Sequence, residues 1–435
     1  MIVVAVLVLI GFLILIMMYV LLTIEFMHRT AVAIFIAGIV FIVNIVFRFC
    51  SFEELFEGID LDTILLLMNM MIIVGVLGKS GLFQYIALYL VSRFYRKPFK
   101  LLVLLMLFTA GVSAFIDNVT TILLVAPVII EICRRLRVSP IPPLLCMVFS
   151  SNIGGTATLI GDPPNIIIGS TAKLGFMAFI YNLTPIVVID MLLFIPLVKL
   201  LFRKWFIVYS ERLVKHGESI RREFLNGSVR YDRELMRKTL AILFIVIALF
   251  FLEDILKYPP AVPAMIGAGL LLLFVRKRVC IEEVMEFIDW STLVFFIAMF
   301  MIIRGIEFMG VLDCITNAIA STTTNYKLLL VIIAWFSAIV SAFVDNIPFV
   351  ISMIPVIRSL ALKLSVNATP LYWALSLGGC LGGNATMVGA SANIVAVGLA
   401  SRSGYHISFR EFMKYGFPVM IATVAVASIY LVVMN

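Results

Sequence analysis

Apolar runs separated by short polar stretches dominate the chain. Many of these runs reach or approach the ~20 residues that a helix needs to cross a bilayer. The run at 1–22 has no basic start and no small-residue cleavage site, so we expect it to remain as a membrane span. The pattern predicts ten spans, at residues 1–22, 30–48, 61–78, 142–172, 181–202, 239–256, 261–275, 290–309, 371–400 and 415–434. The predicted fold class is therefore an all-α polytopic membrane protein.

Polar and glycine positions of the first half recur in the second half. Ser113-Ala-Phe-Ile-Asp-Asn118 recurs as Ser341-Ala-Phe-Val-Asp-Asn346, an offset of 228 residues. Glu53-Glu54 matches Glu282-Glu283 at an offset of 229. Several blocks in nearly one register are not explained by apolar composition, because the matching residues are the polar ones and the glycines. The chain is therefore expected to contain two homologous repeats.

The stretch 203–238 between the repeats is the most polar part of the chain. It holds ten Lys and Arg against five Asp and Glu, which indicates a cytoplasmic linker. The repeats then cover residues 1–202 and 239–435, each with five spans, and an odd number of spans gives them inverted orientations. We expect an integral protein of a prokaryotic plasma membrane, with both termini outside.

Two apolar segments, about 100–137 and 328–357, do not fit the count of spans. Each is too long for one ordinary helix and is interrupted by a polar Asp-Asn pair. We interpret each as a re-entrant hairpin, the first entering from the cytoplasm and the second from outside. A single long tilted helix is the alternative.

The two Asp-Asn pairs are the first candidate site. An ionised Asp at membrane depth is costly unless it is paired or wetted, which favours a functional role. Carboxylate, amide and hydroxyl oxygens suit a small cation, and a buried carboxyl group can hold a proton. The alternative is a structural role as a helix N-cap. The candidate residues are Asp117, Asn118, Thr120, Thr121, Asp345 and Asn346.

The second candidate site consists of two interrupted spans, about 142–172 and 371–400. Glycines in both, and Pro163-Pro164 in the first, predict broken helices whose freed backbone groups line protein or a wet cavity. Half-helix ends there would favour ions, whereas close packing of glycines is the alternative. Asp162 has no acidic equivalent, because Ala390 occupies its place. The candidate residues are Asn152, Gly154, Gly155, Thr156, Thr158, Asp162, Asn165, Gly382, Gly383, Asn384, Thr386, Ser391 and Asn393.

Composition excludes several classes of protein. Only 13% of the residues are charged, against about 25% in soluble domains. The net charge of +8 lies in short clusters between apolar runs, so we expect no nucleic-acid partner. The six Cys are scattered, and no nucleophile–base pair is apparent. We expect no enzyme, no cofactor and no structural metal; a transported Na⁺ would bind at Asp117 and Asp345.

The paired motifs, with Asn-Ile-Gly-Gly-Thr-Ala-Thr-Leu-Ile-Gly-Asp-Pro-Pro-Asn165 the longest, resemble the ion transporter superfamily. The similarity extends to its branch of melanosomal P protein, arsenite-efflux permeases and sodium–proton antiporters. It implies a homodimer with a fixed scaffold and a mobile part, made of the hairpins and broken helices, that moves by an elevator mechanism. The related dicarboxylate symporters carry Ser-Asn-Thr where this chain has Asp-Asn.

The predicted function is secondary active transport of a small inorganic ion or small molecule across the lipid bilayer. Two carboxylates would repel an anionic substrate unless they are protonated, so proton coupling is favoured, as sodium/proton or arsenite/proton antiport. An ATPase partner would accompany only the arsenite type. The alternatives are an organic-anion carrier of the citrate type and an anion channel.

Overall fold

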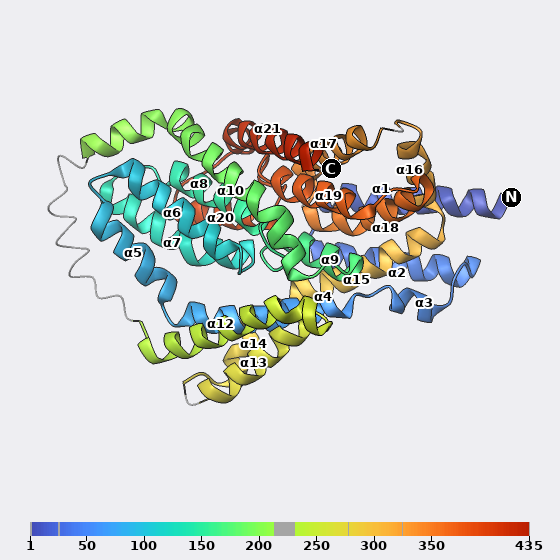
Figure 1. Ribbon diagram of the computed structural model, residues 1–435, viewed down its shortest axis with the longest axis horizontal. Coiled ribbons are helices and arrows are strands. Elements are labelled where there is room, and N and C mark those ends of the chain that lie inside the picture. The colour runs from blue at the N-terminus through green and yellow to red at the C-terminus, as the bar shows by residue number, and fades with distance from the viewer. Residues whose placement is uncertain (1, 25–26, 213–230, 277, 324, 435) are drawn as a thin grey trace.

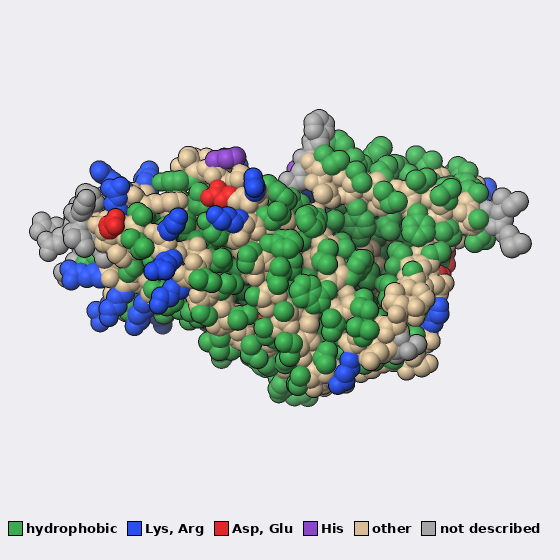
Figure 2. All heavy atoms as spheres, turned by 90° about the horizontal axis from the view of Figure 1, so that it is seen from above, with side chains coloured by type: hydrophobic (Ala, Val, Ile, Leu, Met, Phe, Trp, Pro, Cys, Tyr) green, Lys and Arg blue, Asp and Glu red, His purple; other side chains and the backbone are tan. Residues whose placement is uncertain are grey.

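Helices are the regular elements of the computed structural model, which describes residues 2–24, 27–212, 231–276, 278–323 and 325–434 (Figure 1). Among these residues, nine helices are long and apolar enough to cross a membrane. Apolar side chains also cover much of the outer surface, as Figure 2 shows, and Leu200 and Phe244 are 74% and 73% exposed. Such a surface is stable against lipid. The predicted all-α polytopic membrane fold is confirmed.

Twenty helices have defined bounds. The first repeat contains α1 (Ile2–Ile24), α2 (Arg29–Phe47), α3 (Phe52–Glu57), α4 (Leu61–Lys79), α5 (Leu82–Phe94), α6 (Pro98–Ser113), α7 (Asn118–Leu136), α8 (Ile141–Gly155), α9 (Pro163–Ala172) and α10 (Phe176–Leu201). The second contains α12 (Arg233–Leu256), α13 (Ala261–Val275), α14 (Ile281–Glu286), α15 (Trp290–Phe308), α16 (Val311–Ala320), α17 (Tyr326–Phe343), α18 (Asn346–Leu364), α19 (Ala368–Gly382), α20 (Ser391–Arg402) and α21 (Phe409–Met434).

The ten helices of one repeat match the ten of the other in order. The details of their ends match as well. Gly81 and Gly310 each have a φ of 79°, and each directly precedes a helix. Asp60 caps α4 through the backbone N–H of residue 63 at 3.2 Å, and Asp289 caps α15 through that of residue 292 at 3.1 Å. A left-handed residue and an Asp N-cap are conformational requirements of the backbone, so their recurrence confirms the two-repeat architecture.

Four helices were not anticipated from the apolar pattern. The six-residue α3 and α14 precede α4 and α15, and α5 and α16 follow them. The short α3 has a capping box, in which Ser51 accepts from the backbone of Glu54 and the Glu54 side chain accepts from that of Ser51. Each of α3 and α14 is too short to show a hydrophobic period, which explains why the pattern missed them.

Both hairpin segments consist of two helices. α6 ends at Ser113 and α7 begins at Asn118, while α17 ends at Phe343 and α18 begins at Asn346. The single long helix considered above therefore does not form. In Figure 1 the first hairpin lies toward one end of the long axis and the second hairpin toward the other. The second extends beyond residue 357, to Leu364, because its continuation still buries apolar side chains.

The polar segment 203–238 is partly helical. Residues 203–212 are helical, and α12 begins at Arg233 rather than near 239. Asp232 explains this start, since its carboxylate accepts from the backbone N–H groups of Glu234 and Leu235. The central part of the predicted linker, 213–230, lies outside the described residues.

The repeats pack across each other. α2 packs against α15, and α4 packs against α13, forming one group with α1 and α12. α8 contacts α19, α7 contacts α20, α9 contacts α18 and α10 contacts α21, forming a second group with α6 and α17. Both hairpins and both broken helices thus belong to the second group.

Close backbone approach unites the hairpins with the broken helices. A Cβ atom on Gly154 would lie 2.4 Å from Ala110 Cα, and one on Gly382 would lie 2.6 Å from Ala338 Cα. These glycines let α6 approach α8, and α17 approach α19, more closely than any side chain permits. The close-packing explanation of the glycine motif therefore holds at these two positions.

Gly154→Ala should separate α6 from α8, because the added methyl group meets backbone atoms that cannot rotate away. We expect a loss of about 1–3 kcal/mol in unfolding free energy, as for overpacked cores. Gly111→Ala, on α6, is the control, since no atom lies within 4 Å of its added Cβ. Thermal unfolding in detergent measures both, and equal midpoints would refute the close approach.

Candidate functional site

The hairpin tips carry the two predicted acids as helix N-caps. Asp117 accepts from the backbone N–H of Thr120 at 2.9 Å, and Asp345 accepts from that of Ile347 at 3.1 Å. The capping role considered from sequence is thus present in both repeats. It uses one oxygen of Asp345, whereas Oδ2 of the same carboxylate accepts from Ser391 Oγ at 2.9 Å. Capping therefore leaves part of each carboxylate available for other contacts.

The Asn that follows each acid is buried. Asn118 Oδ1 accepts from the hydroxyl groups of Ser113 and, at 3.2 Å, Ser151, which joins the first tip to α8. A Cβ on Gly155 would lie 2.5 Å from that oxygen, so glycine is required beside it. Asn346 is also buried, at the second tip. The first-repeat tip is thus connected to its own broken helix.

Two threonines follow Asn118 and remain within the first tip. Thr120 supplies the backbone N–H that Asp117 accepts. Thr121 is fully buried, and its hydroxyl lies 3.4 Å from the carbonyl oxygen of Ile116. Both therefore stabilise the turn between α6 and α7.

Each break in a broken helix is closed by an asparagine from the half-helix that follows. Asn165 Nδ2 donates to the carbonyl oxygens of Thr156 and Thr158, at 3.1 and 2.9 Å. Asn393 Nδ2 donates to those of Gly383 and residue 386, at 2.7 and 2.8 Å. The carbonyl groups freed by helix breakage are thereby satisfied inside the protein, as the membrane interior requires.

The breaks also contact the tips. The hydroxyl of Thr158 donates to the carbonyl oxygen of Ala114, and the hydroxyl of Thr386 donates to that of Ala342. These are equivalent pairs in the two repeats, 228 residues apart. Thr158 and Thr386, which were predicted as ligands, therefore join each break to the tip of its own repeat in this conformation.

Buried amides connect one repeat to the other. Asn152 Nδ2 donates to Asn384 Oδ1 and to Asn393 Oδ1, both at 3.0 Å. Ser376 Oγ donates to Asn165 Oδ1 at 2.6 Å. Oδ1 of Asn152 and Nδ2 of Asn384 have no hydrogen-bond partner in the structure as described. The predicted residues of both breaks thus meet in one polar cluster at the centre of the molecule.

Asp162 is the acid nearest this cluster. It is 3% exposed, and its Oδ2 atom has no hydrogen-bond partner among the described residues. Its backbone occupies the N-cap position of α9, but its side chain makes no capping bond. Asn118 of the first tip and Cys380 of α19 lie beside its carboxyl group. A buried carboxyl oxygen without a partner is the clearest indication of a ligand position in the cluster.

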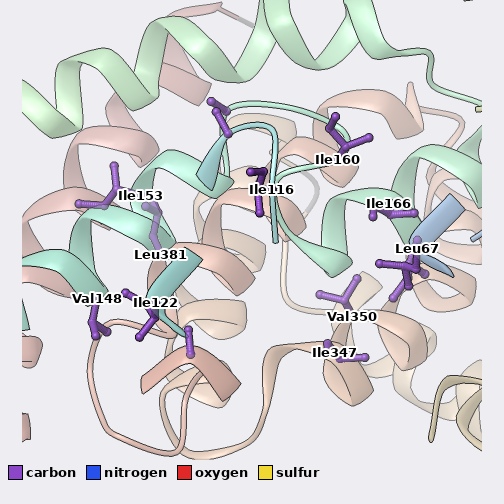
Figure 3. Close-up of a cluster of buried hydrophobic side chains, with 14 of the residues drawn as sticks. Leu67, Ile116, Ile122, Val148, Ile153, Ile160, Ile166, Ile347, Val350 and Leu381 are labelled. Atoms are coloured by element: carbon purple, nitrogen blue, oxygen red, sulfur yellow. The ribbon is translucent and has the colours of Figure 1, made fainter. Parts of the chain in front are cut away.

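Apolar side chains enclose this polar centre. Figure 3 shows buried residues from α4, α7, α8, α9, α18 and α19, among them Ile116 of the first tip and Ile160 of the first break. Such surroundings lower the local dielectric constant and strengthen interactions between charges. Asp117 and Asp345 each lie within electrostatic range of Asp162. Adding a proton or a cation to Asp162 therefore affects the other two.

Arg29 is a site residue that the sequence analysis missed. It begins α2, and its guanidinium lies 3.4 Å from Asp345 Oδ2 and donates to Thr292 Oγ1 at 2.9 Å and to Ser391 Oγ. Nothing in its local sequence indicates a partner 316 residues away in the chain. Arg29 connects the first helix group to the second hairpin tip.

One cavity lies at the second tip and another lies farther along α18, and the two share no lining residue. One, of about 350 Å³, is lined by Arg29, Asp289, Asp345 and Ser391. The other, of about 380 Å³, is lined by Asp60 and by residues of α9, α15 and α18, including Arg304. Each lies between the first helix group and the second. Asp289 is a second site residue that the sequence analysis missed.

A further buried acid lies apart from this cluster. Asp190, near the middle of α10, is fully buried, and neither carboxyl oxygen has a hydrogen-bond partner among the described residues. Aligning Pro185 with Pro418 places Thr423 at the equivalent point of α21, where its hydroxyl donates to a backbone carbonyl. A lone Asp within an apolar span is itself a signal, and it was overlooked because no motif surrounds it.

The donor set of the cluster consists of carboxyl, amide and hydroxyl groups. These are ligands for hard cations and carriers of protons. Within the described ranges, no group of three or more His, Cys, Asp or Glu side chains is arranged to hold a metal ion.

Comparison with known sequences also indicates a transporter. A sequence profile described as CitMHS, citrate transporter, matches residues 13–378. The uncharacterized transporter Rv2684 of Mycobacterium tuberculosis (strain ATCC 25618 / H37Rv) is 38% identical over 422 residues, covering 95% of each chain. The P protein of Homo sapiens is 32% identical over 495 residues, covering 95% of this chain and 58% of that protein.

A solved structure supports the fold. The crystal structure of the Alcanivorax borkumensis YdaH transporter, described as having an unusual topology, matches with a TM-score of 0.58. The match covers 89% of this chain and 88% of that one at 15% sequence identity. At this identity the similarity concerns the arrangement of helices.

Arg29→Gln should weaken the contact between α2 and the second tip, because it removes a partly buried guanidinium from Asp345 and two hydroxyl groups. Hydrogen bonds to charged groups contribute roughly 1.5–3 kcal/mol each, so we expect a lower thermal midpoint. Arg48→Gln, at the other end of α2, is the control, and Arg29→Lys should retain part of the contact. If Arg29→Gln and Arg48→Gln unfold at the same temperature, the contact is not stabilising.

Proposed function

The chain belongs to the CitMHS citrate transporter family of the ion transporter superfamily, and we propose that it is a proton-coupled secondary transporter. Asp117 and Asp345 take up a proton or a small cation in this mechanism, with antiport as the form of coupling. The substrate passes the cluster formed by the two hairpin tips and the two breaks. Sodium/proton and arsenite/proton exchange are the two forms that this donor set suits.

The observation that carries the proposal is the position of Asp162 beside the first tip. Its buried, unpartnered carboxyl oxygen lies beside Asn118, within electrostatic range of Asp117 and Asp345. A buried carboxylate beside two further acids is repelled by them unless cations or protons neutralise the charges. Competition between a proton and a cation for such a site is the physical basis of exchange.

The helix groups support an elevator form of alternating access. The second group holds both tips and both breaks, and it meets the first group across the two separate cavities. Moving the second group past the first would expose the cluster to one membrane face and then to the other. In this proposal the chain is a homodimer anchored by α1, α2, α4, α12, α13 and α15, with both termini outside and the linker cytoplasmic.

An organic-anion carrier is the second candidate, favoured by the description of the family as citrate transporters. The half-helices α9 and α20 begin beside the cluster, and helix N-termini favour anions. Arg29 adds a positive charge on the side of Asp345. An anion would need the acids to be protonated, so this form of transport would also depend on pH.

Asp117→Asn and Asp345→Asn should each abolish coupled transport and leave the protein folded, because an amide retains the shape and part of the capping bond but cannot titrate. The test uses proteoliposomes containing a pH-sensitive dye, with gradients of sodium, lithium, arsenite, citrate or chloride. We expect at least a tenfold loss of substrate-driven pH change in both variants.

Asp313→Asn, an exposed acid on α16, is the matched control and should transport as wild type does. Wild-type exchange in both tip variants would disprove the mechanism. A pH change driven by citrate, and by neither cation nor arsenite, would establish the second candidate. Flux without saturation or coupled proton movement would identify a channel.

A further inference from the structure

A basic pocket lies away from the transport cluster, where α10 runs into the helical residues 203–212 beside the start of α6. Its volume is about 660 Å³. Four cations line it, Lys97, Lys100, Lys199 and Arg203, together with one acid, Glu211. The transport mechanism uses none of these residues.

The pocket has an excess of positive charge. Four cations against one acid leave a formal charge of +3. The ion pairs found among the described residues involve none of the four cations. Two of them lie over aromatic rings instead, Lys100 over Phe94 at 4.8 Å and Lys199 over Phe99 at 5.7 Å. Like charges gathered in one concavity repel each other unless an anion enters.

The surroundings of the pocket indicate the membrane–water interface. Figure 2 shows Lys and Arg side chains gathered at one end of the molecule, next to the apolar surface. Leu200 and Ile207, at the pocket or next to it, are 74% and 53% exposed. Nearby, Phe99 packs edge-on against Phe206 at 5.7 Å, and Trp205 donates to a backbone carbonyl. Aromatic rings and basic side chains together are typical of the headgroup region.

The second repeat arranges its cations differently at the equivalent place. There the start of α17 meets the end of α21, and Lys327 Nζ donates to the carbonyl oxygen of Val432 at 3.0 Å. Lys327 stands at the place of Phe99 and Val432 at the place of Lys199, by the offsets of the two helix pairs. One cation is thus satisfied by the protein itself in the second repeat, whereas the first repeat leaves a charged concavity. The difference separates this feature from the shared architecture.

We propose that this pocket binds the phosphate headgroup of an anionic phospholipid. The cations contact the phosphate, while the acyl chains lie on the exposed apolar side chains beside it. Anionic headgroups attract nearby Lys and Arg side chains, and basic pockets between helices suit them. The lipid holds the cytoplasmic end of the first hairpin at the leaflet, independently of what the protein transports.

Delipidated protein in neutral detergent tests the proposal by native mass spectrometry. The probes are dioctanoyl-phosphatidylglycerol, dioctanoyl-phosphatidylcholine and inorganic phosphate. We expect saturable binding of the phosphatidylglycerol and at least tenfold weaker binding of the phosphatidylcholine and of inorganic phosphate. Lys97→Gln combined with Lys199→Gln should weaken the binding of phosphatidylglycerol at least tenfold. Arg410→Gln combined with Lys414→Gln, which removes as much charge outside the pocket, should leave it unchanged.

Several results would overturn the proposal. Equal binding of both lipids would show that the pocket does not select lipids by headgroup charge. An equal loss of phosphatidylglycerol binding in the control variant would show that any basic surface suffices. If inorganic phosphate binds as tightly as phosphatidylglycerol, the pocket is a phosphate site rather than a lipid site. If the double variant does not purify as a single species, Arg203→Gln takes its place, and undiminished binding there would also count against the pocket.

Discussion

Satisfying backbone carbonyl groups inside the membrane is the constraint on which the whole centre depends. A helix that breaks at membrane depth leaves polar groups that lipid cannot solvate. Asn165 and Asn393 supply the missing hydrogen bonds from the half-helix beyond each break. Those two amides stabilise the breaks that the glycines and Pro163-Pro164 introduce. The breaks in turn create the half-helix ends, and Oδ2 of Asp162 has no hydrogen-bond partner among the described residues.

The two repeats share a framework and differ in chemistry. Both tips have an acidic N-cap, and both breaks are closed by Asn. Among the described residues, the acid in the break and the arginine that contacts a tip each occur in one repeat only. Ala390 replaces Asp162, and Arg29 reaches Asp345 alone of the two tips. Paired structure with unpaired charge gives the two sides of the centre different electrostatic environments.

The hairpins and the broken helices could be predicted because they depend on the residue types at those positions. Glycines, prolines and Asp-Asn pairs constrain the backbone where they occur, so the hairpin tips and the breaks could be located from the sequence, whereas the end of the second hairpin could not. Contacts between distant segments leave no such trace. Arg29 and Asp289 gain their significance only when α2 and α15 meet the second tip, and α3 was too short to show a period.

The amides that join the two breaks also bear on how the chain is made. Asn152 donates to Asn384 and Asn393, and Asn165 accepts from Ser376, so each break depends on the other repeat. During synthesis the first repeat enters the membrane before its partners exist. Its polar groups must meanwhile be met by water, lipid headgroups or the insertion machinery. Completion of the second repeat is therefore the step that closes the centre, and an interrupted chain would remain open there.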